Sequence, residues 1–64
     1  MWRVDGFKTK EEAQAFKKKE GGIVLWDERT PTGRETARAK DYRIAMQATG
    51  LDREAFPFVV ERRW

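Results

Sequence analysis

The side chains best suited to chemistry in this 64-residue chain are five cations grouped between positions 29 and 43. They are Arg29, Arg34, Arg38, Lys40 and Arg43. The same stretch contains only two acidic residues, so it holds a charge of +3, which equals the formal net charge of the whole chain. A local positive field attracts polyanions and acidic protein surfaces, and arginine binds phosphate through two parallel hydrogen bonds. These five residues are therefore the candidate nucleic-acid-binding site.

A solvated loop that charge keeps soluble is an equally good interpretation of the same stretch. Glu35 and Asp41 lie inside it and weaken the field that a polyanion would meet. Both interpretations stay open at the level of sequence.

An enzymatic function is not expected. The chain has no histidine, cysteine or serine, which are the usual acid–base and nucleophilic groups. Adjacent carboxylates occur at Glu11-Glu12 and Asp27-Glu28, but neighbouring side chains on a helix or strand point apart. We therefore predict no catalytic residue, no metal site, no cofactor and no small-molecule substrate.

Length and composition indicate one folded domain over residues 1–64. Charged residues make up 39% of the chain, yet aromatic residues reach 12%, which is unusual for a disordered chain. The amino terminus lacks a signal-peptide pattern, and no apolar run approaches the ~18 residues of a membrane span. We expect a soluble, cytoplasmic protein with no membrane partner.

Three segments have clear local signals. Trp2 and Val4 alternate with polar residues, which predicts a short strand. Thr9 and Glu12 form a capping box, and Gly21 follows a lysine-rich last turn, so we predict a helix over 10–20. The β-branched and aromatic run at 23–26 predicts a central or near-central strand.

The second half of the chain is harder to assign. Residues 28–40 hold no apolar side chain larger than alanine, which predicts a long basic loop or hairpin tip with a turn at 30–33. Residues 41–49 show both alternation and good helix formers, and alternation favours a strand. A turn at 50–57 and a last strand from Phe58 follow.

These elements predict a small two-layer α+β domain in the order β-α-β-β-β. One helix packs on one face of a mainly antiparallel sheet of three or four strands. A single short helix leaves part of the other face exposed. We assign Val24, Trp26 and Val59 to that face as the candidate interaction surface, which a partner protein or a second copy of the chain would cover.

The segment Gly6-Phe7-Lys8-Thr9-Lys10-Glu11-Glu12-Ala13-Gln14-Ala15-Phe16 resembles a stretch in the arm-site DNA-binding domains of phage-type tyrosine recombinases. It is also similar to the last helix of the hybrid-binding domain of some ribonucleases H. The opening Trp-x-Val-x-Gly-Phe and the ending Phe-Pro-Phe-Val-Val look like small proteins of bacterial phages and mobile elements. The resemblance implies nucleic-acid binding and a phage or mobile-element setting, without assigning binding residues.

Two functions follow from these patterns. The first is a non-enzymatic accessory protein that binds nucleic acid through the basic central loop. The second is a protein-binding adaptor or inhibitor, for example a phage product that acts on a host or defence protein. A homodimer, and a protein of no assignable function, are the remaining alternatives.

Overall fold

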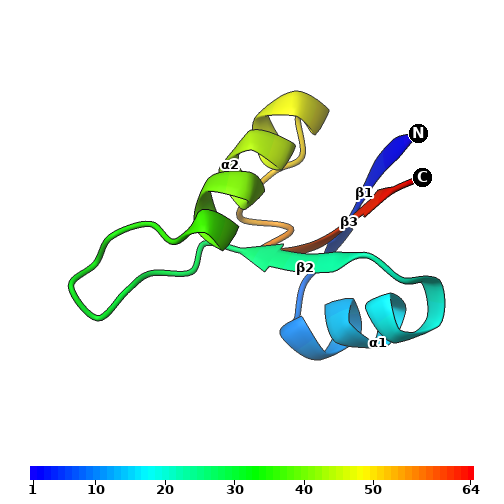
Figure 1. Ribbon diagram of the computed structural model, residues 1–64, viewed down its shortest axis with the longest axis horizontal. Helices are drawn as coiled ribbons and strands as arrows, with labels where there is room; N and C mark the ends of the chain where they lie inside the picture. Colours follow the sequence, from blue (N-terminus) through cyan, green and yellow to red (C-terminus); the bar gives the residue numbers. More distant parts are fainter.

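A computed structural model describes residues 1–64. The elements in chain order are β1 (Trp2–Phe7), α1 (Lys10–Glu20), β2 (Ile23–Trp26), α2 (Ala37–Thr49) and β3 (Phe58–Arg63). The three strands form one sheet in the order β1-β3-β2, and β3 is antiparallel to both neighbours (Figure 1). The chain therefore is a small α+β domain, with three strands and two helices instead of one helix.

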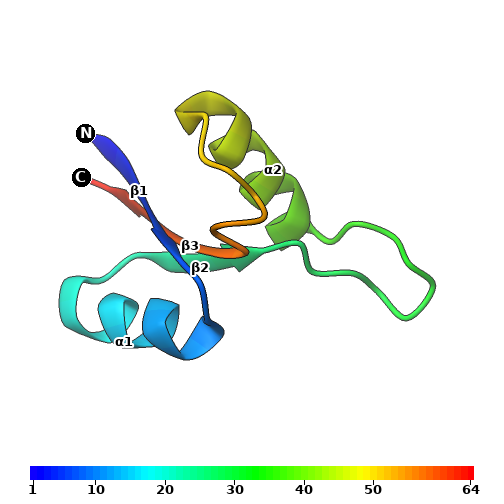
Figure 2. The ribbon, with the colours of Figure 1, turned by 180° about the vertical axis from the view of Figure 1, so that it is seen from behind.

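The two helices lie on opposite faces of the sheet (Figures 1 and 2). On the α1 face, Ala13 packs with Val24 and Val60. On the α2 face, Tyr42 and Met46 pack with Leu25 and Val59. The predicted two-layer arrangement is therefore wrong, because both faces are covered by a helix.

Helix α1 has the predicted bounds because its end signals are local. The Thr9 hydroxyl accepts a hydrogen bond from the Glu12 amide at 3.2 Å and donates one to the Glu12 carboxylate at 3.1 Å. Gly21 has a φ of 82°, and its amide donates to the Lys17 carbonyl at 2.7 Å. These contacts satisfy backbone groups that a helix end leaves free.

The predicted strand over 41–49 is wrong, because these residues lie in α2. The Thr36 hydroxyl caps the helix by accepting from the Ala39 amide at 3.3 Å. Ala39, Tyr42 and Met46 are buried at helical spacing, so the apolar stripe has a period near 3.6 residues. Ile44, which the strand would have buried, is 58% exposed on α2. The alternation in the sequence therefore did not reflect burial.

Strand β2 lies at a sheet edge, so the predicted central position is also wrong. Its partner β3 occupies the middle. Val24 and Leu25 are nonetheless both buried, because α1 covers one face of the strand and α2 covers the other. The apolar run therefore indicates that both faces of the strand are buried. It does not indicate the position of the strand in the sheet.

The predicted long loop over 28–40 is shorter, since α2 begins at Ala37. Residues 27–36 form a hairpin-like arm that projects beyond the sheet and helices (Figures 1 and 2). Arg29 and Glu35 form an isolated antiparallel bridge in the arm. The turn at its tip has the predicted position, with the Gly33 amide donating to the Thr30 carbonyl at 2.8 Å.

The link from α2 to β3 closes the core on the α2 face. Asp52 starts a tight turn, in which its carboxylate accepts from the Glu54 amide at 3.1 Å. The buried Tyr42 hydroxyl donates to the Phe56 carbonyl at 2.8 Å. The ring of Phe56 lies directly against the Gly6 backbone, where a Cβ atom would meet the Phe56 Cγ at 2.6 Å. Glycine is therefore required for this approach of the link to β1.

Candidate functional site

The five predicted nucleic-acid-binding residues are divided between two elements. Arg29 and Arg34 lie on the arm, and Arg38, Lys40 and Arg43 lie on α2. Three of the five form ion pairs with carboxylates of the same region. The pairs are Arg29–Asp27 at 3.1 Å, Arg38–Glu28 at 2.9 Å and Arg43–Glu35 at 3.2 Å.

Ion pairing changes the charge that a partner would meet. Asp27 and Glu28 stand just outside the basic stretch in sequence but are paired with arginines inside it. Over residues 27–43, five cations therefore face four carboxylates, which leaves 5 − 4 = +1. Arg34 and Lys40 are the two cations of the five that have no carboxylate oxygen within 4.0 Å.

Two of the paired arginines hold the arm against the rest of the protein. Arg43 on α2 donates to both carboxylate oxygens of Glu35, from Nε at 3.2 Å and from Nη2 at 3.4 Å. Arg38 pairs with Glu28 and also lies over the Trp26 ring, 4.5 Å from its centroid. The sequence offered no signal for these contacts, because they depend on α2 running beside the base of the arm.

Trp26, one of the three predicted interaction residues, is a half-buried packing residue. The Lys10 ammonium lies 4.3 Å from its ring centroid, and the Phe58 ring is 6.0 Å away. Together with Arg38, these groups surround the indole at the edge of β2. Such cation–π contacts stabilise a ring that is only partly desolvated.

The predicted exposed sheet face is wrong. Val24 packs under α1 and Val59 packs under α2, so the two residues lie on opposite faces. Val59 is fully buried and Val24 is 8% exposed. The register pairs Leu25 with Val59 and Val24 with Val60, whereas the sequence prediction puts Val24 and Val59 on one face.

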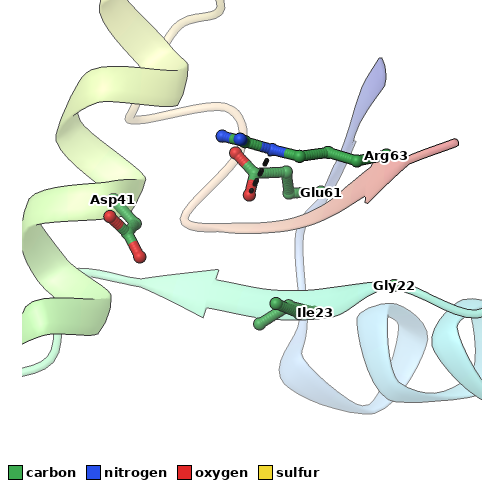
Figure 3. A pocket seen from close by; sticks show the side chains of 5 residues that line it. All are labelled: Gly22, Ile23, Asp41, Glu61 and Arg63. Atoms are coloured by element: carbon green, nitrogen blue, oxygen red, sulfur yellow. Dashed lines mark ion pairs between the residues drawn. The ribbon is translucent and has the colours of Figure 1, made fainter. Parts of the chain in front are cut away.

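An open hollow instead lies between α2 and the far end of the sheet (Figure 3). It has a volume of about 510 Å³ and is lined by Gly22, Ile23, Asp41, Glu61 and Arg63. We call it the α2 groove. Asp41 comes from α2, Ile23 from β2, and Glu61 and Arg63 from β3. None of these residues was a sequence candidate, because the groove exists only once α2 is a helix.

Apolar and charged groups alternate around the α2 groove. Ile23 is 55% exposed, and the Glu61 carboxylate accepts a hydrogen bond from the indole Nε1 of Trp2 at 3.0 Å. The Arg63 guanidinium lies 3.6 Å from the same carboxylate. Asp41 forms no ion pair. The groove therefore combines apolar surface with one carboxylate free to bind a cation.

A second hollow adjoins the first at Arg63. It is lined by Met1, Trp2, Arg63 and Trp64, and has a volume of about 660 Å³. Trp64 is 64% exposed, and its ring lies 5.3 Å from the Arg62 guanidinium carbon. Exposed apolar side chains are thus concentrated at the end of the sheet where the two chain ends lie side by side (Figure 1).

The ionisable groups of the structure include one clear pKa change. Burial raises the pKa of the Tyr42 hydroxyl above 10.0, while the neighbouring Arg53 opposes the change. No group of three or more carboxylates is arranged to hold a metal ion, and neither helix has the length and apolarity needed to cross a bilayer.

No family model matches the chain, and neither the curated proteins nor the solved structures contain a detectable match. The resemblance of residues 6–16 to recombinase and ribonuclease H segments therefore stays a prediction.

Proposed function

We propose that this chain is a non-enzymatic protein-binding module that docks a segment of another protein in the α2 groove. The observation that carries the proposal is the exposure of Ile23 in the same groove as the unpaired carboxylate of Asp41. Elsewhere, α1 and α2 close the cores on both sheet faces. Apolar surface rimmed by polar groups is typical of protein interfaces, and Trp and Arg are the residues that most often dominate their energetics.

The groove also defines the chemistry of the partner. Two carboxylates, Asp41 and Glu61, face one guanidinium, that of Arg63, so the groove has a negative balance. Glu61 already accepts from Trp2 and lies near Arg63, which leaves Asp41 as the free group. The complementary partner is a protein segment that places an apolar side chain on Ile23 and a basic side chain beside Asp41. The sequence resemblance to phage proteins supports a host or defence protein as its source.

Affinity capture with matched variants tests this function. Ile23→Asp and Asp41→Lys change exposed groove residues, and Lys18→Glu changes an exposed residue on the outer side of α1. We expect a specific partner to bind the wild-type chain and Lys18→Glu, with its Kd raised at least about tenfold by each groove variant, or about 1.4 kcal/mol. Partners that bind all four proteins equally would contradict the proposal. Thermal melts of the variants verify that each one remains folded.

Nucleic-acid binding is the second candidate, and one observation favours it. Arg34 at the arm tip and Lys40 on α2 are exposed and unpaired. A two-stranded ribbon has the width that the major groove of DNA admits. With about two phosphates neutralised, the slope of log K against log salt would be about −1.8. Titration of duplex DNA, single-stranded DNA and RNA at low salt, with Arg34→Glu/Lys40→Glu as control, decides the matter. An affinity that does not change with salt concentration, or that is the same for the double variant and the wild-type chain, rules this function out.

A further inference from the structure

The outer edge of β1 has free backbone hydrogen-bonding groups. Met1 and Trp64 exchange both backbone hydrogen bonds, since the Met1 ammonium donates to the Trp64 carbonyl and the Trp64 amide donates to the Met1 carbonyl. In an antiparallel pair such residues alternate with residues whose N–H and C=O point away from the partner strand. Trp2, Val4 and Gly6 are the residues that point away, and their amides donate to no side chain and to no turn or loop carbonyl. Strand β1 therefore presents an unpaired edge six residues long.

The opposite edge of the sheet is more strongly protected. Strand β2 has four residues, and the Trp26 carbonyl at its end already accepts from the Glu28 amide at 2.7 Å. Lys10 and Arg38 also stand over the Trp26 ring. Short edges flanked by cations are a common protection against unwanted pairing. The sheet thus has one closed edge and one open edge.

We propose that a second copy of this chain docks antiparallel on β1, so that the two sheets join into one continuous sheet. The sequence of β1 is complementary to itself when it is paired about Val4. Val4 then faces Val4 of the second copy, and Arg3 faces Asp5 of the second copy. Opposite charges directly across an antiparallel pair are stabilising, whereas like charges are destabilising. A parallel copy in register would set Arg3 beside Arg3, so the charges select the antiparallel arrangement.

The backbone register agrees with this pairing. The three outward residues Trp2, Val4 and Gly6 are symmetric about Val4, so each meets an outward residue of the second copy. Each contributes one N–H and one C=O, which allows up to about six hydrogen bonds between the copies. Arg3 and Asp5 then form the closely spaced pairs that have no backbone bonds between them, where side chains approach most closely. Arg3 is largely exposed and lies 3.3 Å from Asp5 of its own chain, so its guanidinium is already near the seam.

The apolar residues of the seam also match. Trp2 of one copy would cross Gly6 of the other, where the absence of a side chain leaves the backbone bare. The Phe56 ring lies against that glycine and would receive the indole. Trp2 is 39% exposed in the single chain, so it has surface left to bury. An aromatic ring placed over a strand glycine is a known way of fixing strand register.

The helices leave room for the second copy. Helix α1 packs over the middle strand β3, through Ala13 and Val60. In the joined sheet the two β3 strands stand three strand spacings apart, about 14 Å. Helix axes approach to 8–10 Å when they pack, so the two copies of α1 would not collide. A two-fold axis perpendicular to the sheet also places both α2 grooves on the same face of the dimer.

Sedimentation of chemically synthesised variants tests the proposal independently of the groove function. N-methylation of the Val4 amide removes an outward N–H and blocks the edge while keeping every side chain. Arg3→Asp places two carboxylates opposite each other, and Lys8→Asp makes the same charge change outside the pairing. We expect concentration-dependent dimers for wild type, for Lys8→Asp and for Ile23→Asp. The dimer Kd should rise at least tenfold with Arg3→Asp, and N-methyl-Val4 should stay monomeric up to about 1 mM, the weak end of measurable association.

Two results would overturn the β1 seam. The first is a wild-type chain that is monomeric up to about 1 mM. The second is an N-methyl-Val4 chain that dimerises as wild type does, which would place the contact on another surface. Isotope-filtered NMR spectra of a mixture of labelled and unlabelled chains measure the register directly. The Arg3 and Asp5 Hα atoms of different copies are close only in the proposed pairing. A variant that loses the partner protein but still dimerises separates this proposal from the groove function. A variant that is monomeric but still binds the partner protein does so as well.

Discussion

Replacing Tyr42 by phenylalanine tests the core on the α2 face. Tyr42 is 1% exposed, and its hydroxyl donates to the Phe56 carbonyl at 2.8 Å. The substitution keeps the ring but leaves that carbonyl without its donor. Losing a hydrogen bond and leaving a partly buried acceptor unsatisfied costs about 1–2 kcal/mol. In a domain of this size, each kcal/mol lowers Tm by about 4–8 °C.

The same variant isolates a pH dependence. Burial raises the pKa of the Tyr42 hydroxyl above 10.0 in the folded chain. Below pH 10 the hydroxyl keeps its proton in both states, so its contribution to stability is fully present. Above pH 10 the unfolded chain releases the proton first, so the free energy of unfolding falls as the pH rises toward the folded pKa. The Tyr42→Phe protein lacks this component.

Urea denaturation of both proteins at pH 7, 9 and 11 measures the two effects. The wild-type chain should be more stable than Tyr42→Phe by about 1–2 kcal/mol at pH 7 and 9, and the difference should shrink at pH 11. A variant as stable as wild type at pH 7 would refute the buried hydrogen bond. A difference that stays constant through pH 11 would refute the raised pKa.

Substitutions at three further places probe the fold. Met46→Ala should cost about 2–4 kcal/mol by chemical denaturation, while Ile44→Ala on the exposed side of α2 should stay within about 0.5 kcal/mol; a loss at Ile44 as large as that at Met46 would favour the strand assignment. Gly6→Ala should cost about 1–3 kcal/mol in thermal melts, because the added methyl meets the Phe56 ring, and a neutral result would contradict that contact. Arg38→Ala should lower stability by about 1 kcal/mol and shift tryptophan fluorescence, whereas Arg38→Lys should recover part of both; an unchanged spectrum would argue against the cation–π contact.

The distribution of charge shows why counting along the chain overstates the positive field of the basic stretch. The stretch from 29 to 43 holds +3, but its boundaries exclude Asp27 and Glu28. Asp27 pairs with Arg29 two residues away, and Glu28 pairs with Arg38 because α2 begins beside the base of the arm. Ion pairs form between side chains on either side of the boundary at which the counted stretch ends. A local charge excess therefore indicates a binding field only where the cations lack carboxylate neighbours in space.

The α2 groove and the open β1 edge had no counterpart in the sequence interpretation. The sequence predicts strands at Trp2 and Ile23, where an apolar residue is expected to be buried. Their exposure follows from the position of α2, which covers Leu25 and Val59 but leaves the far end of the sheet open (Figures 1 and 3). Asp41 joins the groove because it lies on the side of the helix next to the buried stripe. Whether an apolar strand residue is exposed therefore depends on the neighbouring element and not on the residue type.

The sequence by itself determined the features that residues within a few positions of one another control. These include the capped helix over 10–20, the strand at 23–26, the turn at Thr30–Gly33 and the strand that begins at Phe58. Only the tertiary structure decided whether 41–49 would be a strand or a helix, since Tyr42 and Met46 fit either period until the sheet offers one face to bury them. It also decided the strand order, the pairing of the arginines and the location of the groove. Those features depend on contacts between residues far apart in the chain, which propensity and spacing do not encode.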